Sequence, residues 1–369
     1  MSRRIRVGIL FGGRSAEHEV SILSARNVVR ALDPDAYEPV LIGIDRSGRW
    51  TLQSQHVLEA AIDPRAVGLE AGTPSVAIEA IPSGQAAAAS QAAAVDVVFP
   101  VLHGTMGEDG TVQGLLELAD VPYVGAGVLG SAVGMDKDVM KRLLRDAGIP
   151  VARHVAVRKA DLLRDPAATC ARASELGFPL FVKPANSGSS IGIRRVTDPG
   201  TLADAFAHAF EFDTKALAEE AVPGREIECS VLGGDDPIAS EVGEIIVQHA
   251  DQFYSYSAKY LDENGALLQI PAALDPAQVA EVKRLAIASF RALECYGLAR
   301  VDFFLRSDGA LFVNEINTIP GFTAISMYPK LWEASGLSTR ALVSRLIELA
   351  LQRHEERRQL KRAPELPSR

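Results

Sequence analysis

Short apolar runs alternate with amphipathic stretches over the first third of the chain. The apolar run at 5–11 ends at Gly12 and Gly13, and a segment with helical spacing follows at 15–32. This pattern predicts a strand, a tight turn and a helix. Three more apolar runs follow at 40–44, 95–102 and 121–124, and a helical segment lies at 110–119. Alternating strands and helices are typical of a parallel sheet, so we expect residues 1–125 to form a Rossmann-like α/β domain.

The pattern becomes more mixed after residue 125. A helix predicted at 135–147 ends at the stop signals Gly148 and Pro150. Strands are then expected at 178–183, 193–196 and 215–219, and a helix at 201–212. Beyond about residue 220 we expect longer strands at 226–232 and 238–247 and helices at 276–294 and 339–352. A hairpin is expected at 298–317. The predicted fold class is therefore α/β, with α+β character in the C-terminal part.

Changes of pattern near residues 125 and 220 suggest two or three domains and a tail. The domains are expected at 1–125, 126–219 and 220–352, which suits a chain of 369 residues at roughly 100–200 residues per domain. The tail at 353–369 is rich in Arg and Glu and contains two prolines, and we expect a fraying helix followed by a flexible end. An Ala-rich stretch at 85–94 has no periodic apolar face, and we assign it no function.

Composition and charge exclude several classes of protein. With 47% hydrophobic and 23% charged residues, the chain can build large cores, unlike disordered or fibrous proteins. The net charge of −9 argues against nucleic-acid or membrane-surface partners. The three cysteines are widely spaced, and no apolar run resembles a signal peptide or a membrane span. We therefore expect a cytoplasmic protein with reduced thiols.

The segment 298–317 contains the most informative pattern. Two apolar strands flank Asp308 and Gly309, a strong signal for a hairpin with a two-residue loop. In that register the polar residues pair across the hairpin, Asp302 with Glu315 and Arg300 with Asn317. Side chains two residues apart share one face of a strand, so these groups are expected to converge. Carboxylates and an amide suit Mg²⁺, which commonly also binds nucleotide phosphates.

A solvated outer face of the hairpin is the alternative, in which Arg and Asp merely pair. We favour the metal site because the opposite face, which includes Val301 and Phe303, is apolar, and solvent faces usually mix Lys, Thr and Ser. A longer turn would shift the register and break the predicted pairing.

Glycine-rich segments and lysines supply candidate phosphate contacts. The chain has no GxxxxGK[ST] motif and no GxGxxG after its first strand, so neither a P-loop nor a dinucleotide cofactor is expected. The loop at 186–192 follows a strand that ends at Lys183, and its Gly and Ser residues are suited to bind phosphate. A flexible hairpin loop is an equal alternative. Lys137, Lys259 and His103 are further candidates, with solvated lysines and a structural histidine as the alternatives.

Several motifs follow one another in a set order along the chain. They are Gly12-Gly-Arg-Ser-Ala-Glu-His-Glu-Val-Ser21, His103-Gly-Thr-Met-Gly-Glu-Asp-Gly-Thr-Val-Gln-Gly114, the serine loop after Lys183, Tyr256-Ser-Ala-Lys-Tyr260, Arg300-Val-Asp302 and Asn314-Glu-Ile-Asn-Thr-Ile-Pro-Gly-Phe-Thr323. In this order they closely resemble the D-alanine D-alanine ligase family of the ATP-grasp superfamily, from residue 5 to about residue 350.

The resemblance implies an ATP-grasp fold in which the central and C-terminal domains grip ATP and the N-terminal domain binds substrate. The implied nucleotide contacts are Lys137, Lys183, Ser189, Ser190, Lys259, Glu219 at the adenine amino group and Glu226 at the ribose. The implied ligands of two Mg²⁺ ions, for which Mn²⁺ can substitute, are Asp302, Glu315 and Asn317. The hairpin register predicts the same cluster independently.

The implied reaction is the ATP-dependent ligation of two D-alanines for peptidoglycan precursor synthesis. The carboxylate of the first D-alanine attacks the γ-phosphate, and Lys259 with Mg²⁺ neutralises the developing charge. The amine of the second D-alanine then attacks the acyl phosphate, and the products are D-alanyl-D-alanine, ADP and phosphate. The family pattern assigns the tetrahedral oxyanion to the Arg300 guanidinium and the Gly321 backbone N–H.

Further roles in substrate binding follow from the same resemblance. Glu17 would hold the ammonium of the first D-alanine, with a helix-capping carboxylate as the alternative. Ser189 and Tyr260 would join Glu17 in a network that closes the 186–192 loop and excludes water. Ser326 would help to bind the carboxylate of the second substrate. His103 would orient or deprotonate its incoming amine.

Other functions remain as alternatives. Related ligases use D-serine or D-lactate as the acceptor, but the segment 256–260 matches the dipeptide-forming type and favours D-alanine. A non-catalytic nucleotide-binding regulator would have lost Glu17, Arg300 or a metal ligand, and this chain retains all of them. The resemblance also implies a homodimer that binds small molecules, D-alanine and ATP, and neither nucleic acid nor membrane.

Overall fold

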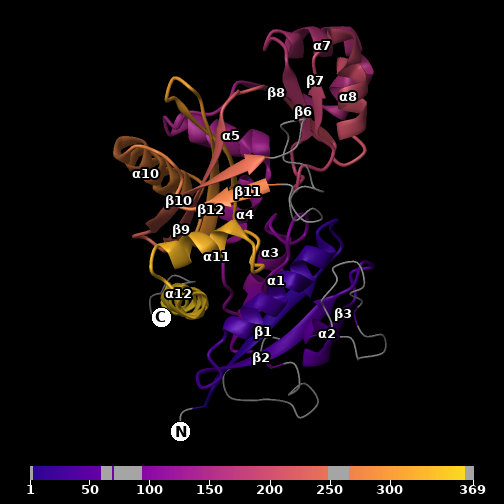
Figure 1. Ribbon diagram of the computed structural model, residues 1–369. Coiled ribbons are helices and arrows are strands. Elements are labelled where there is room, and N and C mark those ends of the chain that lie inside the picture. Colours follow the sequence, from indigo (N-terminus) through magenta and orange to yellow (C-terminus); the bar gives the residue numbers. More distant parts are fainter. Residues whose placement is uncertain (1–2, 60–68, 70–93, 248–265, 362–369) are drawn as a thin grey trace, which may run out of the picture.

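Three β-sheets organise the chain. In the computed structural model, which describes residues 3–59, 69, 94–247 and 266–361, the sheets form three lobes in chain order (Figure 1). The N-terminal lobe is indigo, the central lobe lies at the upper right, and the C-terminal lobe is mainly orange. The predicted mixture of parallel α/β and antiparallel α+β structure is confirmed.

The N-terminal sheet is largely parallel, as the alternating pattern predicts. Its order is β3-β2-β1-β4, and β1 runs parallel to both β2 and β4. The strands are β1 (Ile5–Gly12), β2 (Tyr37–Ile44), β3 (Trp50–Leu52) and β4 (Val97–Pro100). The helices are α1 (His18–Ala31), α2 (Gln55–Glu59) and α3 (Thr111–Leu118). The predicted strand at 121–124 makes only an isolated bridge, from Tyr123 to Val98.

Successive residues of β1 face two different cores. Ile9 and Phe11 pack in one cluster, which includes residues of α1 and of the C-terminal helix α12 (Thr339–Arg358), whereas Leu10 packs in another with Val40 of β2. A strand that is buried on both faces needs apolar residues at every position, which explains the unbroken apolar run at 5–11.

The central sheet is antiparallel, with the order β5-β8-β6-β7. Its strands are β5 (His154–Arg158), β6 (Leu180–Pro184), β7 (Arg194–Val196) and β8 (Lys215–Glu220). Its helices are α6 (Lys159–Arg164), α7 (Pro166–Ser174), the short 3-10 helix η2 (Pro199–Thr201) and α8 (Leu202–Ala209). The sequence patterns did not predict β5, α6 or α7, which are short and present few buried residues.

The C-terminal sheet has the order β11-β10-β9-β12-β13 and is also antiparallel. Its strands are β9 (Arg225–Gly233), β10 (Ile238–Val247), β11 (Ala266–Gln269), β12 (Gly297–Leu305) and β13 (Leu311–Asn317). The flanking helices are α4 (Val128–Met135), α5 (Lys137–Asp146), α10 (Pro276–Ala292) and α11 (Met327–Ala334). Met140 and Leu144 of α5 share a core with this sheet, although the sequence places them in the central domain.

The C-terminal helix α12 differs from the prediction. It continues to Arg358, six residues beyond the helix predicted at 339–352 and into the segment that was expected to begin as a fraying helix. The guanidinium of Arg353 donates to the carbonyls of Gly125, at 2.7 Å, and Tyr123, at 2.9 Å. These acceptors belong to a segment more than two hundred residues away in the sequence, so no local pattern could reveal them.

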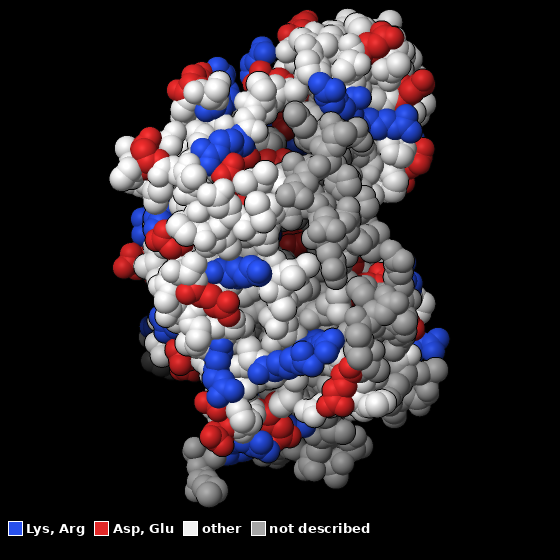
Figure 2. Space-filling model, in the orientation of Figure 1, with Lys and Arg blue, Asp and Glu red and all other residues white. Residues whose placement is uncertain are grey.

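The surface mixes charges of both signs. Figure 2 shows Lys and Arg interspersed with Asp and Glu over the described part of this face. None of the helices in the described ranges combines the length and the apolar character that crossing a membrane requires.

Candidate active site

The hairpin of β12 and β13 pairs its polar residues as predicted, but its loop and its register differ from the prediction. Arg300 lies opposite Asn317, and Asp302 lies opposite Glu315. The predicted two-residue loop is wrong, because Arg306 N–H donates to the Ala310 carbonyl at 3.0 Å and closes a three-residue loop.

A β-bulge compensates for the longer loop. From the turn inward the register runs Leu305 to Leu311 and Phe303 to Val313, and it then shifts by one residue at Asn314. The extra residue places Glu315, instead of Asn314, opposite Asp302. Two departures from the simple hairpin therefore cancel at the predicted site.

The guanidinium of Arg300 ties the cluster together. Its Nε and Nη2 each donate to Asp302 at 2.7 Å, and Nε lies 2.9 Å from Glu228 Oε2 on β9. Asn317 Nδ2 also donates to Asp302, at 3.0 Å. Burial alone would lower the pKa of Arg300, but the Asp302 and Glu228 carboxylates raise it well above its ordinary value. Glu228 is a site residue that the sequence did not predict.

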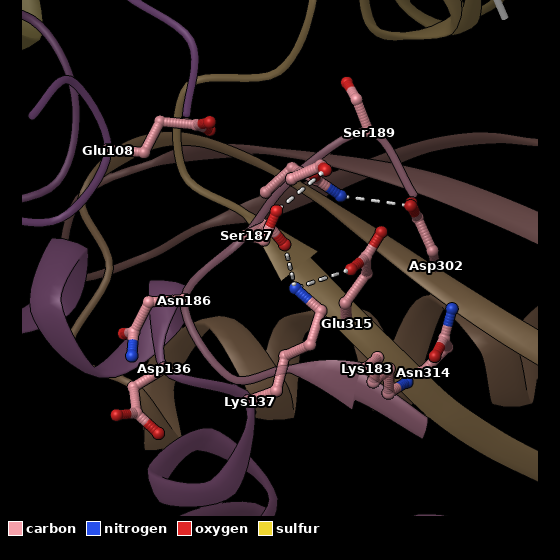
Figure 3. A network of polar contacts seen from close by, with 12 residues as sticks. Glu108, Asp136, Lys137, Lys183, Asn186, Ser187, Ser189, Asp302, Asn314 and Glu315 are labelled. Carbon is pink, nitrogen blue, oxygen red and sulfur yellow. Dashed lines mark hydrogen bonds and ion pairs between the residues drawn. The ribbon is translucent and has the colours of Figure 1, made fainter. Parts of the chain in front are cut away.

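Lys137 connects the hairpin with the serine loop. The predicted helix at 135–147 is divided, because Asp136 adopts an extended conformation, ends α4 and caps α5 by accepting from Val139 N–H at 3.0 Å. Lys137 is therefore the first residue of α5. Its Nζ lies 3.3 Å from Glu315 Oε2 and donates to the Ser187 carbonyl at 2.8 Å (Figure 3).

Two lysines hold Glu219 of β8. Lys183 Nζ at the end of β6 lies 2.6 Å from Glu219 Oε1, and Lys141 Nζ of α5 lies 2.8 Å from Oε2. Burial would raise the pKa of Glu219, yet the two lysines lower it to about 2. Lys141 also donates to the Asn314 carbonyl at the bulge, at 3.1 Å. The sequence did not predict Lys141, although its spacing of four residues places it on the same helix face as Lys137.

Glu17 precedes α1 and contacts the serine loop. Its buried carboxylate accepts a hydrogen bond from Ser189 Oγ. The alternative role as a capping carboxylate is not supported, because the Glu17 side chain accepts no hydrogen bond from the first turn of α1. Ser189 and Ser190 both have positive φ, 49° and 60°, so the loop holds an uncommon backbone conformation at this contact.

His103 is buried, and both of its ring nitrogens are engaged. Nδ1 lies 3.0 Å from the Ile319 carbonyl and therefore carries the proton, and Nε2 lies 2.9 Å from Ser24 Oγ. Burial lowers the pKa of His103, which favours the neutral ring. In this conformation the imidazole bridges the N-terminal lobe and the loop after β13.

Glu108 is a second residue that the sequence did not assign to the site. Its carboxylate accepts from Gly104 N–H at 2.7 Å and from Ile319 N–H at 3.1 Å. Burial and the nearby Glu17 raise its pKa to about 8, while the two backbone donors oppose that rise. The only sequence signal was its place in the motif that begins at His103.

The loop from 318 to 326 carries the remaining predicted residues. Ser326, just before α11, accepts from Thr323 N–H at 3.0 Å. A Cβ added to Gly321 would lie 2.9 Å from Ser326 Oγ, so the close approach of these residues favours glycine. Glu226 lies on β9, half-buried, in the sheet that carries the hairpin. Lys259 and Tyr260 lie outside the described residues.

The described site residues from all three lobes therefore meet at one place. The central and C-terminal lobes contribute lysines, carboxylates and a serine loop, and the N-terminal lobe contributes Glu17 and His103. Together with the likeness to solved structures described below, this fold places the chain in the ATP-grasp class.

Comparison with known sequences gives the family. The family described as "D-ala D-ala ligase N-terminus" matches residues 6–126, and "D-ala D-ala ligase C-terminus" matches residues 143–348. A D-alanine--D-alanine ligase of Oceanobacillus iheyensis is 49% identical over 96% of this chain and 98% of its own length. A D-alanine--D-alanine ligase A of Chromobacterium violaceum is 51% identical over 95% and 96% of the two chains. The chain belongs to the D-alanine D-alanine ligase family.

Solved structures agree with this assignment. The D-alanine-D-alanine ligase of Coxiella burnetii has a TM-score of 0.82 at 38% identity and covers 96% of this chain and 98% of its own. The VanG D-Ala:D-Ser ligase of Enterococcus faecalis has a TM-score of 0.80 at 35% identity and covers 94% and 100%. The likeness therefore extends over all three lobes.

Proposed function

We propose that the protein ligates two D-alanines to D-alanyl-D-alanine at the expense of ATP, through an acyl phosphate. The observation that carries this proposal is the convergence of the hairpin residues Arg300, Asp302 and Glu315 with Lys137, in a chain of this family. The relatives named as D-alanine ligases at about half identity support D-alanine as both donor and acceptor.

The nucleotide is proposed to lie between the central and C-terminal sheets. Lys137 and Lys183 would contact its phosphates and the adenine region, and Ser189, Ser190 and Lys259 would also bind the phosphates. Glu219 would accept from the adenine amino group. Glu226 would bind the ribose. The ionised state of Glu219 supports its role, because a carboxylate accepts hydrogen bonds and cannot donate them.

The donor set of the hairpin fits Mg²⁺ or Mn²⁺. Asp302, Glu315 and Asn317 offer two carboxylates and an amide oxygen on paired strand positions, and hard divalent cations prefer such oxygen ligands. When bound, the ions would supply charge neutralisation at the transferring phosphoryl group.

The chain's own residues then account for both chemical steps. In the first, Glu17 holds the ammonium of one D-alanine so that its carboxylate attacks the γ-phosphate, which leaves ADP and an acyl phosphate. In the second, the amine of the other D-alanine attacks that carbonyl, loses a proton, and expels phosphate. Arg300 and the Gly321 N–H stabilise the oxyanion between these events. The contact of Ser189 with Glu17 supports a serine loop that excludes water from the acyl phosphate.

For His103 the geometry argues against proton removal and favours an indirect role, in which the ring holds the loop after β13 in place. Both ring nitrogens are bonded to protein groups, so neither is available to an incoming amine in this conformation. We propose that Ser326 helps to bind the second carboxylate and that Tyr260 completes the Glu17 network.

A D-serine acceptor is the second candidate, because the VanG D-Ala:D-Ser ligase shares the fold at 35% identity. We further propose the domain boundaries at 1–125, 126–219 and 220–352, a cytoplasmic location, a homodimer and a place in peptidoglycan precursor synthesis. The free cysteines at 170, 229 and 295 are consistent with a reducing compartment.

The test is phosphate release from MgATP by the purified protein, with mass detection of the product. D-alanine alone should support release and yield the dipeptide, and Glu315→Ala should abolish turnover while its circular dichroism spectrum stays native. Release that requires D-alanine plus D-serine or D-lactate would replace the proposed acceptor. ATP binding without release under any condition would favour a regulator.

A further inference from the structure

The loop that carries Gly321 is held at both ends by the N-terminal lobe. At its start, Ile319 is held through both of its backbone polar groups, since its N–H donates to Glu108 at 3.1 Å and its carbonyl accepts from His103 at 3.0 Å. The loop itself belongs to the C-terminal lobe, because it directly follows β13.

The other end of the loop is held in the same way by α1. Phe322 N–H donates to Ser24 Oγ at 3.2 Å, and the Phe322 carbonyl accepts from Asn27 Nδ2 at 2.9 Å. Ser24 is fully buried and also lies 2.9 Å from His103 Nε2, so it joins the two ends of the loop. The Phe322 ring is buried, 6.1 Å from Phe99 and 5.8 Å from Tyr328 between ring centroids.

Gly321 lies between these two anchors, and its backbone N–H differs from theirs. Both neighbouring anchor residues, Ile319 and Phe322, have their N–H groups paired, whereas the Gly321 N–H donates to none of the described residues. A backbone donor that is fixed in place but unpaired is what an oxyanion site requires.

We propose that Ser24 and Asn27 are positioning residues for the Gly321 N–H. The inference rests on the proposed function, in which this N–H stabilises the tetrahedral intermediate of the second step. Glu17 precedes α1, and Ser24 and Asn27 lie two and three turns further along it, so one helix fixes both the substrate ammonium and the oxyanion donor.

The two chemical steps separate this role from a general structural one. Phosphoryl transfer to the first carboxylate forms no tetrahedral carbon, so it should not depend on Asn27. Attack of the amine on the acyl phosphate does form one, and loss of one oxyanion donor typically costs about 10²–10³ in rate. Partial misplacement of the donor should cost less, on the order of 10-fold to 100-fold.

The experiment compares both steps in Asn27→Ala, Ser24→Ala and the wild type. Hydroxylamine traps the acyl phosphate in a single turnover with D-alanine and MgATP, and dipeptide formation reports the second step. We expect the yield of trapped acyl phosphate to equal or exceed that of the wild type, because the second D-alanine consumes it more slowly. The dipeptide kcat should be lower by roughly 10-fold to 100-fold, with an unchanged KM for ATP. Arg30→Ala, an exposed position on the same helix, is the control and should change neither step.

Other outcomes decide against the proposal. An unchanged dipeptide rate in Asn27→Ala would overturn it, and so would a parallel fall of both steps, which indicates general damage. Asn27→Asp keeps the shape of the side chain without the donor, and it should reproduce the defect of Asn27→Ala. A wild-type protein that traps acyl phosphate but makes no dipeptide with D-alanine, D-serine or D-lactate would instead refute the proposed function.

Discussion

Lys141 is a fully buried cation that joins two parts of the site. Its Nζ pairs with Glu219 on β8 at 2.8 Å and donates to the Asn314 carbonyl on β13 at 3.1 Å. Burial lowers the pKa of Lys141, and the Glu219 carboxylate opposes that change. Removing one partner of such a pair leaves the other charge less well compensated, which typically costs about 3–5 kcal/mol.

We therefore expect Lys141→Met to lower the free energy of unfolding by about 3–5 kcal/mol. It should also raise the KM for ATP more than the KM for D-alanine, because Glu219 loses one of its two lysines. Chemical denaturation and steady-state kinetics with each substrate varied measure these effects. Arg142→Met is the control, since the neighbouring Arg142 has an exposed side chain, and a pair made by an exposed cation contributes less than about 1 kcal/mol. Equal changes in both KM values would contradict the assignment.

Glu108 makes stability depend on pH. Burial and Glu17 raise its pKa to about 8 from an ordinary value of 4.5, so the folded protein keeps a proton that the unfolded chain releases. The stability that this carboxyl contributes is therefore complete at low pH and is lost as pH rises from about 4.5 to 8.

Glu108→Gln removes that titration. We expect the melting temperature of the variant, relative to the wild type, to rise steadily between about pH 5 and pH 8. Glu348→Gln, an exposed position on α12, should show a flat difference over the same range. A flat difference for Glu108→Gln as well would show that its carboxyl is ionised throughout.

At the scale of elements, the β12–β13 hairpin shows what the sequence can predict. The apolar runs and Asp308-Gly309 were enough to place the strands and to pair Asp302 with Glu315. They could not predict the three-residue loop or the bulge at Asn314, because these two irregularities compensate each other and leave Asp302 opposite Glu315. The bulge carbonyl is bonded by Lys141, which lies 173 residues away in the chain.

The N-terminus of α5 is the element that delivers Lys137 to the site. Asp136 caps α5 and also pairs with Lys215 at 2.6 Å. We expect Asp136→Ala to lower stability by about 1 kcal/mol or more and to raise the KM for ATP, because Lys137 is the first residue of the helix. Asp165→Ala, which removes the cap of α7, should lower stability similarly and leave the KM unchanged. An unchanged KM in both variants would separate Lys137 from ATP binding.

At the scale of the whole molecule, α12 connects the two ends of the chain. The Arg353 guanidinium lies over the rings of Tyr123 and Tyr296, at 4.5 Å and 4.8 Å, and Arg357 pairs with Glu117 at 2.7 Å. The sequence showed only a run of charged residues here, which is typical of a frayed end. Its partners Tyr123 and Glu117 come from the N-terminal lobe and Tyr296 from the C-terminal lobe, so the segment read in isolation could not show how firmly this last part of the helix is held.

Arg353→Ala should lower the free energy of unfolding by about 2–4 kcal/mol, because two partly buried hydrogen bonds and two cation–π contacts are lost. Denaturant titration of the full chain measures this. Arg345→Ala, on the same helix but in an exposed pair with Glu348, should change stability by less than about 1 kcal/mol. A similar loss of stability in both variants would mean that the contacts of Arg353 with the N-terminal lobe add no stability of their own.

The position of α12 also bears on how the chain is made. Residues 353–358 are synthesised more than two hundred residues after their partners at 117–125. The segment at 117–125 must therefore wait until α12 has been made before α12 can cover it. A protein shortened to residue 352 would keep all of the described catalytic residues and still leave that face open to solvent.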